Sequence, residues 1–144
     1  MPTVSITRLR IRSWRFMPGF VLYTLRSARQ IRRAPGFIGG WLGGSGDNAF
    51  WTITVWRDEA AMRGFRDKAA HKAAMPYLLH WGDEAAMARY EQSGEDLPDG
   101  SAAKTALVAR GRTSKVRNPT EAHAAGKTVP DGRAPQVGRV LRPM

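Results

Sequence analysis

The stretch Ala49–Trp56 constrains the fold of this chain most strongly, because aromatic and β-branched side chains alternate along it with two threonines. A period of two residues is typical of a β-strand. The turn-forming residues Ser45–Asn48 come directly before it, and the glycine-rich apolar segment Phe37–Gly44 comes before those. The sequence therefore predicts a β-hairpin in the first half of the chain.

The residues before this hairpin predict one more strand and a helix. Val4–Phe16 carries β-forming residues separated by polar or arginine positions. Its apolar parity changes between Ile6 and Leu9, which indicates either a bulge or a strand covered on both faces. Met17–Arg33 has apolar residues at spacings of three and four, and Pro35 follows it, so we expect an amphipathic helix there.

A second helix and a fourth strand complete the pattern. Asp58 is a favourable N-cap for a helix over Ala60–Trp81, which Pro76 must kink or split. We assign Ala85–Glu91 as a strand because the layout needs a fourth one. The order strand, helix, strand, strand, helix, strand predicts a ferredoxin-like α+β fold with an antiparallel sheet and both helices on one face.

The other face of this sheet needs a cover. Tryptophans lie on or near the expected strands at positions 14, 41, 51 and 56, and a bare face would expose a large apolar patch. We expect a second copy of the chain to pack there, sheet against sheet, as a homodimer.

The C-terminal part changes in composition. Ser101 is expected to cap a short helix, Ala102–Arg110, that Gly111 closes. After it the chain is rich in proline and glycine and has no aromatic residue, so it has little apolar surface to bury. We therefore divide the chain into a ferredoxin-like domain, residues 1–118, and a basic flexible tail, residues 119–144.

Charge is unevenly distributed along the chain. The net charge is +11, and residues 1–46 contain eight arginines and no acidic residue. Such a segment fits a transit peptide, a nucleic-acid-binding face or a solvated basic surface. There is no secretory h-region and no apolar stretch of about 18 residues, so we expect a cytoplasmic protein without a membrane span. The chain has no cysteine, which excludes disulfides and thiolate chemistry.

Several short segments are similar to those of a known superfamily. They are Arg8–Ser13, Leu25–Ala28, Ala34–Phe37, Phe50–Trp56, Ala70–Pro76 and Arg112–Arg117. With the predicted layout, they resemble the dimeric α+β barrel superfamily of antibiotic-biosynthesis-monooxygenase-like proteins. Within it, the similarity is greatest to spheroidene monooxygenase-like proteins and their uncharacterised bacterial relatives. The resemblance implies a barrel shared by two subunits, with a pocket between sheet and helices in each.

His71 is the leading candidate for chemistry. It shares a predicted helix face with Met75 and Leu78, so it is either a packed core histidine or a pocket group. The resemblance to spheroidene monooxygenase-like proteins, which are thought to use haem, implies that His71 is an axial ligand or an acid/base group. On the first strand, Arg8, Arg10 and Arg12 share one face and are either solvated or clamp a carboxylate, a phosphate or a haem propionate.

The predicted substrate pocket combines large apolar side chains with hydroxyl groups. Its candidate residues are Trp51, Thr52, Thr54 and Met75. With the resemblance, they predict a monooxygenase-like protein that binds an apolar small molecule, with oxygenation either haem-assisted or cofactor-free. Two alternatives stay open: a non-catalytic ligand-binding dimer, and a basic nucleic-acid-binding module with the same layout.

Overall fold

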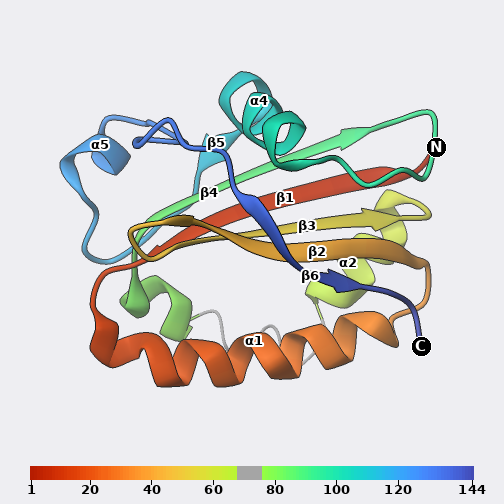
Figure 1. Ribbon diagram of the computed structural model, residues 1–144, viewed down its shortest axis with the longest axis horizontal. Coiled ribbons are helices and arrows are strands. Elements are labelled where there is room, and N and C mark those ends of the chain that lie inside the picture. Colours follow the sequence, from red (N-terminus) through yellow and green to blue (C-terminus); the bar gives the residue numbers. More distant parts are fainter. Residues whose placement is uncertain (68–75) are drawn as a thin grey trace.

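The computed structural model describes residues 1–67 and 76–144. Six antiparallel strands form one sheet in the order β5-β4-β1-β3-β2-β6 (Figure 1). The strands are β1 (Thr3–Ile11), β2 (Phe37–Gly46), β3 (Ala49–Trp56), β4 (Gly82–Glu91), β5 (Arg112–Thr113) and β6 (Gln136–Leu141). The helices are η1 (Trp14–Phe16), α1 (Met17–Arg32), α2 (Glu59–Arg66), α4 (Gly100–Arg110) and α5 (Glu121–Ala124). Residues 76–81 are helical as well.

The four central strands confirm the ferredoxin-like α+β fold. Their order is β4-β1-β3-β2, and α1 and α2 lie together on one face of the sheet (Figure 1). The predicted bounds of β3 agree with the structure, whereas β1 ends at Ile11 instead of Phe16 because the chain turns into η1. The register of β1 is unbroken from Thr3 to Arg10, so there is no bulge between Ile6 and Leu9. The α4 side of β1 is buried, whereas Ser5, Thr7 and Leu9 on the other side face a cavity and Thr7 is exposed.

Helix α4 and the loop before it cover the sheet face opposite α1. Ala103 and Leu107 of α4 are fully buried, in one cluster with Trp41 and Trp51. The indole N–H of Trp41 donates to the carbonyl of Pro98 at 2.8 Å. Trp14 lies off the sheet, in η1, and is 80% exposed. The buried tryptophans therefore do not require a second subunit, and the reason for expecting sheet-to-sheet pairing does not apply to this part of the sheet.

The C-terminal segment is also built into the structure. β6 pairs with β2, and Leu141 is 2% exposed in a cluster with Trp56 and Phe65. This differs from the flexible tail that the composition led us to expect over residues 119–144; the domain boundary itself stays a prediction. Helix α4 also begins one residue earlier than its expected cap, because Asp99 and not Ser101 accepts a hydrogen bond from the first turn.

Among the described residues, no helix is both long and apolar enough to cross a membrane.

Candidate functional site

A cavity of ≈ 570 Å³ lies between the sheet and the helices on the α1 side. Its helical wall includes Phe20 and Tyr23 of α1 and Met62 and Phe65 of α2. Side chains at three- and four-residue spacing face the sheet from an amphipathic helix, which explains why these residues meet there. The volume falls within the roughly 300–1,000 Å³ typical of small-molecule sites.

A strip of hydroxyl groups crosses the sheet wall of the cavity. Ser5 of β1 lies opposite Thr54 of β3, and Thr7 lies opposite Thr52. All four residues line the cavity. The hydroxyl of Thr54 already has one hydrogen-bond partner, because its Oγ1 accepts a hydrogen bond from the indole N–H of Trp56 at 2.9 Å. The strip thus offers polar contacts within a mostly apolar space.

Two of the predicted pocket residues, Thr52 and Thr54, belong to this strip. Trp51 borders the cavity, but strand alternation places its indole in the cluster with Leu107 on the α4 side. Its indole N–H donates to Ser45 Oγ at 3.0 Å. Met75 and His71 lie outside the described residues, so their predicted places in the pocket stay predictions.

Arg10 and Arg12 do not line the described cavity, and both guanidinium groups bond to other parts of the chain. Arg10 pairs with Asp83 and with Asp47. Burial lowers the pKa of Arg10, but the charge and hydrogen bond of Asp83 outweigh it and hold the pKa above its usual value. Arg12 Nε donates to the carbonyl of His80 at 2.7 Å. These contacts bind the end of β1 to its neighbours.

Arg89 on β4 is a cavity residue that sequence reasoning missed. It lies on the same strand face as Ala85 and Met87, all three of which line the cavity. Its Nη1 is buried without a hydrogen-bond partner among the described residues, and Glu59 Oε1 lies 3.6 Å away. That distance makes a long ion pair but no hydrogen bond. The spacing of two residues between positions 85, 87 and 89 is the sequence feature that could have placed Arg89 on the cavity side of this strand.

Tyr23 supplies a further polar group from α1. Burial raises the pKa of its phenol, although a hydrogen bond with Ser27 acts in the opposite direction. Tyr23 therefore contributes a partly buried phenol to the cavity wall, where it is already hydrogen-bonded to Ser27. Among the described residues no cluster of histidine, aspartate and glutamate has the arrangement of a metal site.

The structure is a ferredoxin-like domain with a cavity between the sheet and its helices, and its fold is similar to that of the dimeric α+β barrel superfamily. Residues 7–77, just under half of the chain, match the family model of antibiotic biosynthesis monooxygenases, so this part of the chain resembles that family. A comparison with curated proteins found no match.

Solved structures share the fold at low sequence identity. SnoaB, a cofactor-independent oxygenase from Streptomyces nogalater, is 19% identical, with 65% of this chain and 94% of that chain covered at a TM-score of 0.53. A conserved protein from Methanosarcina mazei is 12% identical over 65% and 94% of the two chains, with a TM-score of 0.59. Rv0793 from Mycobacterium tuberculosis is 15% identical over 65% and 97%, with a TM-score of 0.56.

Proposed function

We propose that this protein is a monooxygenase whose substrate is an apolar small molecule bound between α1 and the sheet. The observation that carries the proposal is the ≈ 570 Å³ cavity with the incompletely paired Arg89 in its wall. The family match and the likeness to a cofactor-independent oxygenase support the same class of reaction.

Arg89 narrows the proposed class of substrate to an apolar molecule that bears an acidic oxygen. A guanidinium in a mostly apolar cavity stabilises a carboxylate, phenolate or enolate more than it would in water. The hydroxyl strip from Ser5 to Thr54 lines the same cavity and would orient such a molecule. Glu59, at 3.6 Å, is too far to satisfy the guanidinium by itself.

A cofactor-free reaction balances without an external reductant. A substrate methylene group becomes a carbonyl while one O₂ is consumed. One oxygen atom enters the carbonyl, and the other leaves as water with the two methylene hydrogens. In the deprotonated substrate, Arg89 would hold the enolate oxygen and so favour loss of the methylene proton.

Haem-assisted oxygenation through His71 is the alternative. In this alternative, Arg10 and Arg12 would clamp the haem propionates. The described residues do not fit that role, because Arg10 is bonded to Asp83 and Arg12 to the His80 carbonyl. Neither arginine lines the described cavity. The visible absorption spectrum of the purified protein distinguishes the two routes. A Soret band that His71→Ala abolishes, in a folded variant, would support haem ligation.

Oxygen consumption with anthrone, a tricyclic aryl ketone with one ring methylene, tests the proposed reaction. We expect anthraquinone to form at one equivalent per O₂, and Arg89→Gln to lower kcat/KM at least tenfold. Arg133→Gln, at an exposed position before β6, is the matched control and should leave the rate unchanged. Unaltered turnover in Arg89→Gln would remove Arg89 from the mechanism, and binding without turnover of this probe or related ketones would favour a ligand carrier.

We further propose that the protein is cytoplasmic and forms a homodimer. Any dimer contact has to lie outside the part of the sheet that α4 covers. Light scattering at micromolar concentration should report about twice the 15.9 kDa of one chain. A monodisperse monomer would contradict the dimer.

A further inference from the structure

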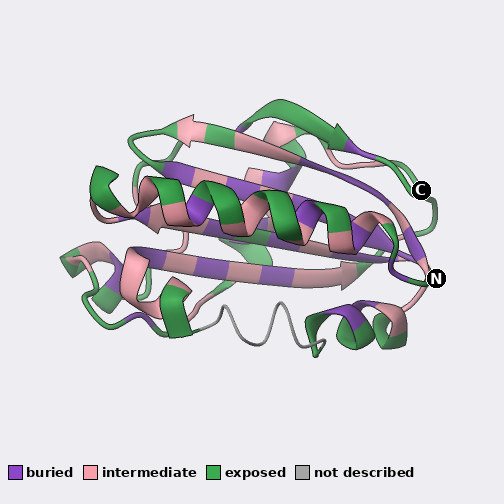
Figure 2. Ribbon diagram, turned by 90° about the horizontal axis from the view of Figure 1, so that it is seen from below, coloured by how far each residue is buried: buried purple, intermediate pink, exposed green. Residues whose placement is uncertain are grey.

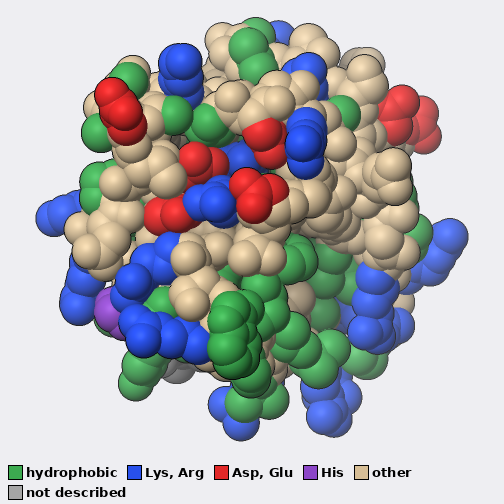
Figure 3. Space-filling model, turned by 60° about the vertical axis from the view of Figure 1, so that its left-hand side comes forward, with side chains coloured by type: hydrophobic (Ala, Val, Ile, Leu, Met, Phe, Trp, Pro, Cys, Tyr) green, Lys and Arg blue, Asp and Glu red, His purple; other side chains and the backbone are tan. Residues whose placement is uncertain are grey.

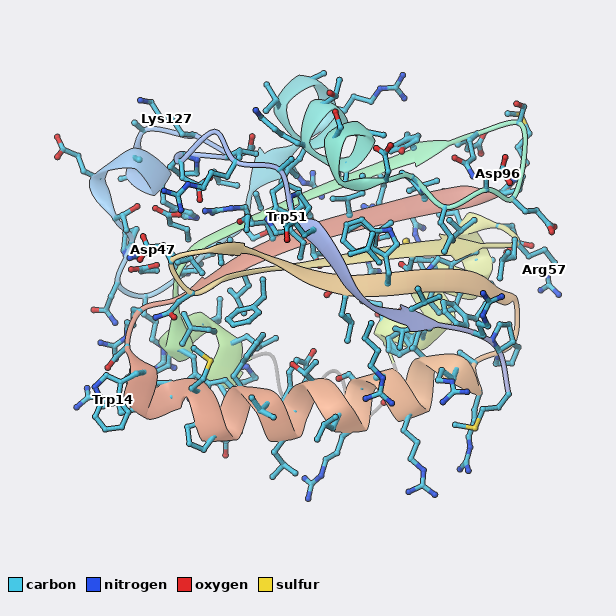
Figure 4. The ribbon with its side chains drawn as sticks, viewed as in Figure 1. Trp14, Asp47, Trp51, Arg57, Asp96 and Lys127 are labelled. Carbon is cyan, nitrogen blue, oxygen red and sulfur yellow. The ribbon has the colours of Figure 1, made fainter. Side chains whose placement is uncertain are left out.

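The outward side of α1 carries an unusual set of exposed apolar residues. Val21, Leu22 and Leu25 are 49%, 50% and 50% exposed. Trp14, in η1 just before the helix, is 80% exposed and points away from the body of the protein (Figure 4). Viewed from below, the helix presents a largely exposed face to solvent (Figure 2). Large apolar residues grouped in this way on a surface typically mark an interaction site.

Arginines continue the same face toward the C-terminal end of α1. Arg26, Arg29 and Arg33 follow Val21, Leu22 and Leu25 at helical spacing, and all three are exposed. None of the three lies within ion-pair distance of an acidic group among the described residues. In Figure 3, hydrophobic and basic side chains occupy the lower part of the molecule, where α1 lies, whereas acidic side chains gather above them.

We propose that this outer α1 face, made of Trp14, Val21, Leu22, Leu25, Arg26, Arg29 and Arg33, docks the protein onto the surface of a bilayer rich in anionic phospholipids. The helix lies along the surface and does not cross it. Its 16 residues span about 24 Å. The apolar half enters the boundary between headgroups and acyl chains, and the arginines contact lipid phosphates.

The positive charge and the apolar residues of the outer α1 face together favour a membrane over a second copy of the chain or a nucleic acid as its partner. A second copy packed on α1 would bury Arg26, Arg29 and Arg33 of both copies without a counter-charge, because residues 1–46 contain no acidic residue, and this cost opposes pairing. A nucleic acid would satisfy the arginines but leave Val21, Leu22 and Leu25 in water. An anionic bilayer satisfies both halves of the face, and the exposed indole of Trp14 suits the headgroup level.

Vesicle co-sedimentation of the full chain tests this proposal. The two probes are phosphatidylcholine vesicles and vesicles of equal parts phosphatidylglycerol and phosphatidylcholine, at low and at physiological salt. We expect binding to the anionic vesicles only, weakened by salt. The triple variant Arg26→Gln, Arg29→Gln, Arg33→Gln should reduce the partition coefficient about a hundredfold, at about fivefold per arginine.

A matched control removes the same charge elsewhere. Lys127, Arg133 and Arg139 are exposed, and Lys127 lies on the opposite side of the sheet from α1 (Figure 4). Changing these three to Gln should alter binding less than threefold. The apolar variant Leu22→Ser, Leu25→Ser should lose at least tenfold without any change in charge. Circular dichroism confirms that each variant is folded.

Trp14 offers an independent optical readout. All five tryptophans lie in the described residues, and Trp14 is the one that is exposed. Anionic vesicles should shift its emission to shorter wavelength and protect it from acrylamide, and both effects should vanish in Trp14→Phe.

Three outcomes would overturn the proposal. One is the absence of binding to anionic vesicles at low salt. Another is an equal loss of binding in the Lys127, Arg133, Arg139 control. The third is binding of duplex DNA that is lost in the arginine variant but kept in the Leu22, Leu25 variant. That result would show that the outer α1 face binds nucleic acid. None of these outcomes bears on turnover in the cavity.

Discussion

Arg8 Nη1 donates to Glu84 Oε1 at 2.9 Å, and the two side chains are 1% and 9% exposed. The pair joins β1 to β4 on the α4 side of the sheet. Glu84 also accepts a hydrogen bond from Thr120, and Arg8 reaches Asp131, so residues from the C-terminal segment complete the network. An arginine that the sequence suggested was solvated or in a pocket is in fact a buried link between the sheet and this segment.

Removing one partner of this pair should destabilise the fold strongly. Arg8→Leu leaves the Glu84 carboxylate buried without its counter-charge, which costs about 3–5 kcal/mol of the free energy of unfolding. Urea denaturation measures the change. Arg63→Gln breaks the exposed pair with Glu59 and is the control, with an expected effect below about 1 kcal/mol. Equal losses in the free energy of unfolding for the two substitutions would show that the buried Arg8–Glu84 pair stabilises the fold no more than an exposed pair.

The C-terminal strand should contribute to stability. Leu141 is 2% exposed, so Leu141→Ala should lower the free energy of unfolding by about 2–5 kcal/mol. Its neighbour Val140 is 47% exposed, and Val140→Ala should change stability by less than about 0.5 kcal/mol. A truncation after Pro135 should lower the melting temperature as well. If the truncated chain melts like the full chain, the composition-based expectation of a flexible tail is correct for these residues.

The bond between Thr54 and Trp56 gives a sharp test of the hydroxyl strip. Thr54→Val leaves the buried indole N–H of Trp56 without its acceptor, at a cost of about 1–3 kcal/mol in the free energy of unfolding. Thr52→Val is the matched control, since Thr52 lies on the same strand face and also lines the cavity. We expect Thr52→Val to affect ligand binding more than stability, as measured by ligand titration and urea denaturation on the same samples.

Asp58 should make part of the stability depend on acid pH. Its side chain accepts a hydrogen bond from the N–H of Ala61 at 2.8 Å. This bond, helped by Arg57, holds the pKa of Asp58 below its usual 3.8. The stabilisation is therefore complete above pH 3.8 and is lost as the pH falls through the lowered pKa of the folded state.

The variant Asp58→Asn isolates this contribution, because asparagine caps a helix at any pH. The difference in melting temperature between the wild type and Asp58→Asn should be constant from pH 7 to about pH 5 and then shift in favour of the variant below about pH 4. A difference that does not change with pH would contradict the role of the Asp58 carboxylate.

Short sequence patterns were sufficient to predict the central strands and the first helix. The alternation along Ala49–Trp56, the turn at Asp47 and Asn48, and the helical spacing after Met17 each act over a few residues, so the sequence displays them directly. Asp47 and Asn48 indeed adopt the positive φ angles of 52° and 62° that suit such a turn. Thr52 and Thr54 line the cavity together because parity on a strand determines which face of the sheet a side chain joins.

Tertiary structure alone decided which surfaces meet. β6 pairs with β2 across nearly a hundred residues of sequence, and backbone pairing of an edge strand needs little apolar composition, so periodicity did not reveal it. The burial of Arg8, the placement of Arg89 in the cavity and the cover that α4 provides over Trp41 and Trp51 depend on contacts between distant segments. The sequence by itself determined the four central strands and α1, because these elements follow from short-range periodicity. The assembly of distant segments determined the roles of the arginines, since a guanidinium becomes buried, paired or poised for a ligand only through the partners that the fold brings to it.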